Sequence, residues 1–218
     1  MLEYTLKQSR RKTIAAYVLD DGTIEVRAPL RVPKSEIDRF ITERENTLKK
    51  YIAMQLEKNE KKNEFELKIG SEILFLGEKY EIRRGDKTEI KNGVFFVTEG
   101  SVKNQVTALY KLAAERIINE RVQYFSQVTG HVPKSVKINA AKSRWGSCSA
   151  KGTLNFSWFL IMANQKAVDY VVTHELSHMK HMNHSEAFWQ EVARYEPEYK
   201  QRRQELKELS ARLQTEKW

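Results

Sequence analysis

Four of the five histidines in this chain of 218 residues fall between positions 174 and 184. The segment begins His-Glu-Leu-Ser-His, which matches the H-E-x-x-H pattern of zinc metalloproteases. On a helix, His174 and His178 share one face, about 6 Å apart along the axis, so both imidazoles can bind one metal ion. Glu175 is placed to act on a water molecule at the remaining position of the metal. The spacing therefore predicts a catalytic zinc site.

A catalytic zinc ion usually has three protein ligands and a water molecule, so the two histidines need a third residue. We expect His184 to be that ligand, and a carboxylate on the following helix, Glu191 or Glu196, is the alternative. His181 is expected to be a surface residue. A structural zinc site would fill all four positions with protein ligands and needs no glutamate between them, so the pattern favours catalysis.

The prediction for His184 requires a break in the helix. If the helix continued, His184 would lie about 15 Å from His174 along the axis, too far for one ion. The helix must therefore end between His178 and His184. Asn183 can adopt the left-handed conformation that ends helices, and Ser185 can begin the next helix.

The expected chemistry is hydrolysis. The metal makes its water molecule more acidic, and Glu175 takes the proton and delivers it to the leaving group. The oxyanion that develops on the substrate needs a positive or hydrogen-bonding partner. Arg144, Asn155 and Tyr195 are candidates, and their spacing does not choose among them.

Composition limits the class of protein. At 40% hydrophobic and 31% charged residues, the chain is expected to be globular. The sole cysteine, Cys148, excludes an internal disulfide framework. No apolar run reaches the ~20 residues of a membrane span, and the first residues lack the apolar segment of a signal peptide. We expect a cytoplasmic protein without membrane association.

The net charge of +9 suits an anionic partner, such as a nucleotide, and weak association with nucleic acid. Acidic residues nevertheless interrupt most basic stretches, which is typical of solvated helix faces. The sequence contains no helix-turn-helix, RNA-recognition or zinc-finger motif. Charge alone therefore does not identify a partner, and the oligomeric state stays open.

Residues 1–100 are predicted to form a β-rich module with one inserted helix. A hairpin is expected over 13–28, around Asp20-Asp21-Gly22, and two more turn at Gly77-Glu78 and Asn92-Gly93. The helix is expected to begin at Ser35, with apolar positions from Ile37 to Leu56.

Residues 101–218 are predicted to form an α+β module that carries the chemistry. A long amphipathic helix runs through Val106–Val128 and ends at Gly130. A strand over 135–138 and a strand pair on either side of Lys151-Gly152 follow. The helix with the histidines begins near Gln165, and the tail is helical with an interruption near Pro197.

The chain resembles the YgjP-like metallopeptidase family, which is related to the SprT-like zinc proteases. The resemblance is densest from about Ala140 to Trp189. It is carried by the segments Ser143–Cys148, Gly152–Asn155, Val171–His178, Asn183–Ser185 and Phe188-Trp189. It is specific because Arg-Trp-Gly-Ser-Cys and the extended histidine motif occur together.

The resemblance implies a zincin-type catalytic domain, with the histidine helix packed on a small mixed sheet. It implies His174, His178 and His184 as zinc ligands and Glu175 as the catalytic base. It also implies that the strand region from Arg144 to 155 borders the cleft, where an edge strand can pair with an extended peptide. We expect Arg144 to act in that cleft.

Three functions follow, in order of preference. The first is a zinc metallopeptidase acting on a peptide or protein, since three histidines with a glutamate base suit peptide hydrolysis. The second is a UTP pyrophosphatase on the same metal site, because some family members are described so. Phosphoanhydride cleavage more often uses oxygen ligands and Mg²⁺, and the chain shows neither a carboxylate cluster of that kind nor a Walker loop. The third is a non-enzymatic module that binds nucleic acid or protein.

Overall fold

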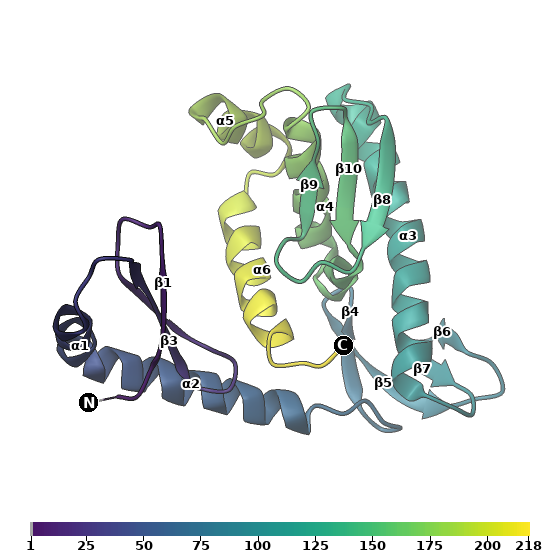
Figure 1. Cartoon of the computed structure of the whole chain (residues 1–218). Coiled ribbons are helices and arrows are strands. Elements are labelled where there is room, and N and C mark those ends of the chain that lie inside the picture. Colours follow the sequence, from purple (N-terminus) through teal and green to yellow (C-terminus); the bar gives the residue numbers. More distant parts are fainter. Residues whose placement is uncertain (1) are drawn as a thin grey trace. The chain divides into compact units, whose positions relative to one another are not determined.

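The computed structural model describes residues 2–218, which form a mixed α+β structure with three small sheets (Figure 1). By packing, the chain divides into two compact units. The first extends to Glu66 and includes Gln214–Lys217, and the second comprises Leu67–Leu213 and Trp218. The α+β class is confirmed. Packing divides the chain at Glu66. The expectation of two domains that meet near residue 100 stays a prediction.

The first unit contains a three-stranded sheet of order β1-β3-β2. Its strands are β1 (Thr5–Ser9), β2 (Ala15–Val18) and β3 (Ile24–Pro29). Strands β2 and β3 form the predicted antiparallel hairpin, and Gly22 in its turn has a φ of 83°. Strand β1 pairs in parallel with β3 and was not predicted, because no apolar alternation marks its five residues.

Two helices cover this sheet where the sequence predicted one. Helix α1 spans Lys34–Glu43 and helix α2 spans Glu45–Glu64, with Arg44 between them at φ −109° and ψ 8°. The prediction of a single helix is wrong because the apolar residues of both helices pack on one sheet core, so their periodicity hides the bend. Ser35 lies inside the first turn, and Pro33 occupies the capping position.

The second unit begins with a four-stranded sheet of order β4-β5-β7-β6. The strands are β4 (Glu72–Phe75), β5 (Glu78–Arg84), β6 (Glu89–Lys91) and β7 (Val94–Val97). Both predicted hairpins are present, but the first turns at Leu76-Gly77, one residue before the predicted Gly77-Glu78. Each has two left-handed residues at its turn, Leu76 with Gly77 and Asn92 with Gly93, as type I′ turns require.

A second sheet in this unit has the order β8-β10-β9. Strand β10 (Thr153–Ser157) pairs in parallel with β8 (Ser135–Asn139) and antiparallel with β9 (Gly146–Cys148). The central strand buries Leu154 and Phe156 completely. Strand β9 therefore forms an edge of the sheet, with one side unpaired in the sheet.

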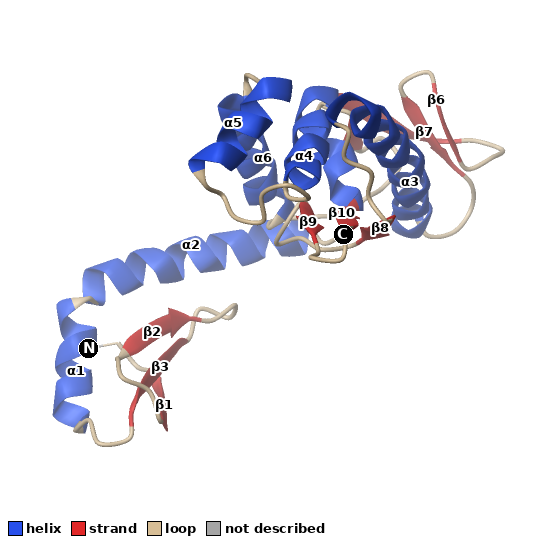
Figure 2. Cartoon of the chain, turned by 90° about the horizontal axis from the view of Figure 1, so that it is seen from above, coloured by secondary structure: helices blue, strands red, loops and turns tan. Residues whose placement is uncertain are grey.

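The helices of the second unit pack around these sheets (Figure 2). They are α3 (Val102–Thr129), the 3₁₀ helix η1 (Trp158–Met162), α4 (Gln165–Ser177), α5 (Glu186–Tyr195) and α6 (Tyr199–Leu213). As predicted, α3 ends at Gly130, which has a φ of 75°, and Pro197 lies between α5 and α6. No helix within residues 2–218 combines the length and hydrophobicity that crossing a bilayer requires.

Helix α4 is held firmly because it contacts α3, α5, α6 and β9. Its apolar side chains, including Val168, Val172 and Leu176, are fully buried in the main core. Asn164 caps its first turn by accepting a hydrogen bond from the Ala167 amide. The last turn of α4, which carries the histidine motif, therefore rests on a rigid support.

Candidate metal centre

Three imidazoles meet at the end of α4. The ring nitrogens of His174, His178 and His184 lie within 4.8 Å of one another, and 3.2 Å separates Nε2 of His174 from Nε2 of His184. In the described part of the chain, no aspartate, glutamate or cysteine joins this group. The structure thus brings together the three histidines that the sequence singled out, in an arrangement that can hold a metal ion.

His184 reaches this position because α4 ends at Ser177. Two tight turns follow, with the amides of Met179 and Lys180 bonded to the carbonyls of Leu176 and Ser177. Ser185 then starts α5 by accepting a hydrogen bond from the Phe188 amide. The predicted helix break is confirmed.

The proposed role of Asn183 in this break is wrong. Among residues 2–218, only Leu76 and Asn92 are non-glycine residues with a positive φ, so Asn183 does not adopt the left-handed conformation. His178 itself occupies the C-cap position in a right-handed conformation. Shorter-range hydrogen bonds end the helix, which a sequence pattern does not reveal.

The turn between His178 and His184 is fastened at two points. Nδ1 of His178 lies 3.0 Å from the carbonyl oxygen of His181, and Lys180 Nζ donates to Glu191 Oε2 at 3.0 Å. Glu191 Oε1 also lies 3.5 Å from His131 Nε2. Glu191, the alternative ligand, therefore holds the turn, and His181 contributes its backbone.

The imidazoles fit a metal ion as neutral ligands. Nδ1 of His174 lies 3.3 Å from the Tyr170 hydroxyl, and Nδ1 of His178 faces a carbonyl oxygen, which leaves Nε2 of both rings free to bind. Burial, followed by the neighbouring His178 and His184, lowers the pKa of His174 to about 3. At neutral pH this imidazole is uncharged, the form that metal ligation requires.

Glu175 lies beside the histidines with little exposure to solvent. Its side chain is 5% exposed, and burial raises its pKa to about 8. Its Oε2 atom has no hydrogen-bond partner among the described residues. The side chain packs closely on Gly146 of β9, where a Cβ atom would lie 2.7 Å from Glu175 Cγ and Oε1. An unpartnered buried carboxyl next to three imidazoles is suited to proton transfer.

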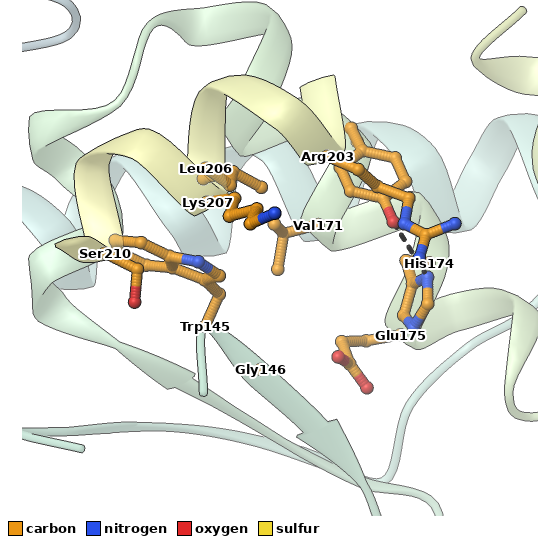
Figure 3. A pocket seen from close by; sticks show the side chains of 10 residues that line it. Trp145, Gly146, Val171, His174, Glu175, Arg203, Leu206, Lys207 and Ser210 are labelled. Carbon is orange, nitrogen blue, oxygen red and sulfur yellow. Dashed lines mark hydrogen bonds between the residues drawn. The ribbon is translucent and has the colours of Figure 1, made fainter. Parts of the chain in front are cut away.

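A cleft of about 390 Å³ opens in front of Glu175 and His174 (Figure 3). Strand β9 with the residue before it, helix α4 and helix α6 form its walls. The lining residues are Trp145, Gly146, Tyr170, Val171, His174, Glu175, Arg203, Leu206, Lys207 and Ser210.

The three residues expected to stabilise an oxyanion do not line this cleft. Arg144 is exposed, Asn155 donates to Ser147 Oγ at 3.4 Å within the sheet, and Tyr195 ends α5. Their roles stay predictions. The cleft instead contains Arg203 and Lys207, which the sequence analysis missed. Their spacing of four residues on a helical tail puts them on one face, but no motif connects that face to the histidines.

Comparison with known proteins identifies the family. A model of the YgjP-like metallopeptidase domain matches residues 12–209. Among solved structures, the metallopeptidase zymogen of Pyrococcus abyssi abylysin is similar at 22% identity over 46% of this chain and 99% of that chain, with a TM-score of 0.39. Such a TM-score supports no conclusion about fold or function. No curated protein matches the sequence significantly. Since the family model covers nearly the whole sequence, the chain belongs to the YgjP-like metallopeptidase family.

Proposed function

We propose that this chain is a zinc-dependent peptidase in which His174, His178 and His184 bind the metal and Glu175 acts as general base. One observation carries the proposal: three imidazoles converge beside a buried carboxyl that has no hydrogen-bond partner among residues 2–218. Membership of a metallopeptidase family supports the reaction class.

Zinc is the metal best matched to this set of donors. Three neutral imidazoles form a ligand set of intermediate softness and leave a fourth position open, as in catalytic zinc sites. Mg²⁺ and Ca²⁺ prefer oxygen ligands, and no carboxylate of the described residues joins the histidine group. When bound, zinc supplies Lewis acidity, which polarises the scissile carbonyl group and makes water acidic enough to lose a proton near neutral pH.

Glu175 performs the proton transfers. Its pKa of about 8 applies to the protein without a cation, and a positive charge beside it favours the carboxylate form. The carboxylate takes a proton from the attacking water molecule and passes it to the departing amine. Because Oε2 is not held by a hydrogen bond, accepting this proton breaks no existing interaction of that atom.

Strand β9 offers a binding surface for an extended peptide. It is an edge strand, and Gly146 together with the preceding Trp145 lines the cleft beside Glu175. A peptide can add to such an edge through main-chain hydrogen bonds, which bring a backbone carbonyl group close to the base. This supports a peptide, rather than a small molecule, as substrate.

Hydrolysis of a nucleoside triphosphate is the second candidate. Arg203 and Lys207 on the cleft wall favour it, because both can bind phosphate oxygens. The nitrogen donors argue for peptide hydrolysis, since phosphoanhydride cleavage more often uses a metal held by oxygen ligands.

Parallel assays separate the two candidates. Zinc-loaded protein is incubated with unfolded casein and, separately, with UTP, beside a Glu175→Gln variant prepared in the same way. We expect casein fragments with the parent protein, none with the variant, and no pyrophosphate in either sample. Pyrophosphate release that requires Glu175, with intact casein, would replace the peptidase by a pyrophosphatase.

A further inference from the structure

Two basic side chains of α6 line the cleft. Arg203 and Lys207 share a face of the helix with Leu206 and Ser210, and this face forms one wall of the cleft opposite β9 (Figure 3). The only acidic residue of the lining is Glu175, which the proposed function uses as base. The cleft therefore carries two cations that the proposed reaction does not require.

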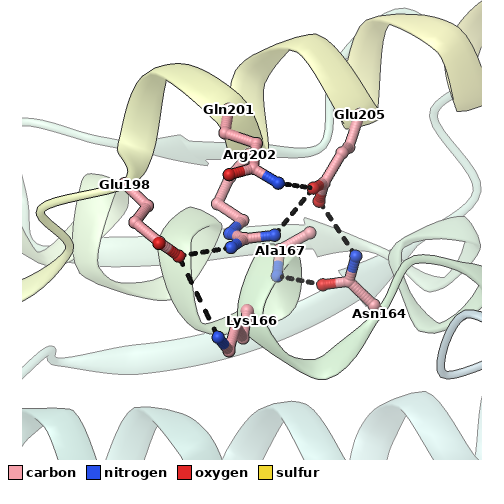
Figure 4. A network of polar contacts seen from close by, with 7 residues as sticks. All are labelled: Asn164, Lys166, Ala167, Glu198, Gln201, Arg202 and Glu205. Carbon is pink, nitrogen blue, oxygen red and sulfur yellow. Dashed lines mark hydrogen bonds and ion pairs between the residues drawn. The ribbon is translucent and has the colours of Figure 1, made fainter.

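A network of polar contacts around the buried Arg202 links helix α6 to α4 (Figure 4). Arg202, which is 6% exposed, donates to Glu198 Oε2 at 2.5 Å and to Glu205 Oε1 at 2.7 Å. Glu205 Oε2 accepts a hydrogen bond from Asn164, the residue that caps α4. Arg203, the next residue along the helix, lines the cleft.

Arg203 is also held by aromatic rings. Its guanidinium carbon lies 4.8 Å from the ring centroid of Trp189. Trp189 in turn stacks on Tyr199 and on His184, with centroid distances of 5.1 Å and 5.5 Å. A chain of ring contacts thus links Arg203 to the histidine group.

Neither cation is neutralised. Within residues 2–218, no carboxylate forms an ion pair with Arg203 or Lys207, whereas Arg202 and Lys180 in the same unit are both paired. Both side chains are exposed to solvent on the cleft wall, so their charges are available to an anion that enters the cleft.

We propose that Arg203 and Lys207 form a subsite that binds a carboxylate of the peptide substrate. This inference rests on the proposed peptidase function. The carboxylate belongs either to an aspartate or glutamate side chain near the scissile bond or to the C-terminus of the peptide. The subsite makes the protein selective for acidic peptides, so it acts on substrate binding and KM more than on kcat.

The test measures peptide binding separately from cleavage. Two fluorescein-labelled, C-terminally amidated peptides differ only in one central glutamate or glutamine. Their affinities are measured by fluorescence polarisation with the full chain carrying Glu175→Gln, with and without zinc. We expect the glutamate peptide to bind about tenfold more tightly, and this ratio to fall with increasing salt.

The variants Arg203→Gln and Lys207→Gln should each reduce this ratio, and the double variant should bring it close to one. Lys200→Gln is the matched control, since Lys200 is an exposed lysine of α6 outside the cleft lining, and it should leave the ratio unchanged. A preference for the glutamate peptide that survives in the double variant would overturn the inference. A ratio of one before substitution would also overturn it if a free C-terminal carboxylate does not strengthen binding either.

Two further arms identify the source of the anion. In the first arm, the glutamine peptide is compared with a free and with an amidated C-terminus. If the free form binds more tightly and this difference depends on Lys207, the subsite binds chain ends, which supports the inference. In the second arm, UTP competes with the labelled peptide. If UTP displaces the peptide only when Lys207 is present, and all peptides bind equally, the cations bind phosphate and the inference is overturned.

The failure of the peptidase proposal would look different. If the parent protein cleaves neither casein nor the peptides, the proposed function fails, but a glutamate preference that depends on Arg203 and Lys207 still supports the subsite. If the glutamine and glutamate peptides are cleaved with equal kcat/KM and bound with equal affinity, and a free C-terminus does not strengthen binding, the peptidase stands and the subsite is refuted.

Discussion

The contact between Gly146 and Glu175 allows a specific prediction about activity. In the Gly146→Ala variant, the added methyl carbon would lie 2.7 Å from both Cγ and Oε1 of Glu175. Ordinary contacts between such atoms begin near 3.5 Å, so one partner must move by about 0.8 Å. Gly146 is held in β9 opposite Phe156 of β10, and therefore the glutamate side chain is the group that we expect to move.

The displacement sets the size of the effect. A shift of about 1 Å in a catalytic group can reduce the rate by about a hundredfold, because the group leaves the position from which it reaches the proton. Overpacking of this kind costs about 1–3 kcal/mol of folding stability. The three atoms nearest to the new methyl carbon all belong to Glu175 and none to an imidazole, so zinc affinity should change little.

The assay is a double-mutant cycle of Gly146→Ala and Glu175→Gln. kcat/KM is measured on a casein-derived peptide, and the free energy of unfolding by urea titration. Gln has the same shape as Glu, so the alanine should cost the same stability in both backgrounds. It should reduce kcat/KM of the parent protein, whereas Glu175→Gln, which lacks the base, should stay inactive with or without the alanine. Full activity in Gly146→Ala, or a loss of stability that differs between the two backgrounds, would refute the reasoning.

Three further predictions concern the metal site and its surroundings. His184→Ala should lower zinc affinity by more than about a hundredfold. His181→Ala keeps the carbonyl group that faces His178 and should leave zinc affinity unchanged. The zinc content of both purified variants, measured by elemental analysis, checks these expectations. Glu191→Ala releases Lys180 and the turn that presents His184, so chelator competition should show zinc binding weakened about tenfold. Burial, and next the Asp169 carboxylate, raises the pKa of Glu196 from 4.5 to about 7. Since the folded protein then favours the protonated carboxyl, the free energy of unfolding of the parent protein should fall as the pH rises from about 4.5 to about 7. Glu196→Gln should lack this loss and be more stable at pH 8, by about 1 kcal/mol after allowing for the residual solvent contact of Glu196. The free energy of unfolding of both proteins is measured at pH 5 and pH 8. The same difference between the two proteins at both pH values would contradict the assignment.

Local chemistry in the sequence predicted the central part of the site. The spacing of His174 and His178 follows from helix geometry, and the distance to His184 required a break that the structure contains. Turn residues were equally informative, because Asn92-Gly93 and Gly130 occupy left-handed positions that few other residues adopt. Residue type was not sufficient at Asn183, which can also adopt this conformation but does not do so here.

Features that depend on tertiary packing escaped prediction. The bend at Arg44 is hidden because α1 and α2 face the same sheet, and β1 forms through pairing with β3 rather than through its own pattern. Arg203 and Lys207 become part of the cleft because α6 packs beside α4, where Glu205 accepts a hydrogen bond from Asn164. These interactions join residues far apart in the sequence, so no local pattern records them.

Reconstitution of metal-free protein with zinc tests the central claim most directly. Cleavage of unfolded casein is measured as zinc is added, for the parent protein and for Glu175→Gln in parallel. The account predicts that activity rises until one zinc ion is bound per chain, and that Glu175→Gln binds the same single ion without cleaving casein. Cleavage by the metal-free protein, or by zinc-loaded Glu175→Gln at the parent rate, would contradict it.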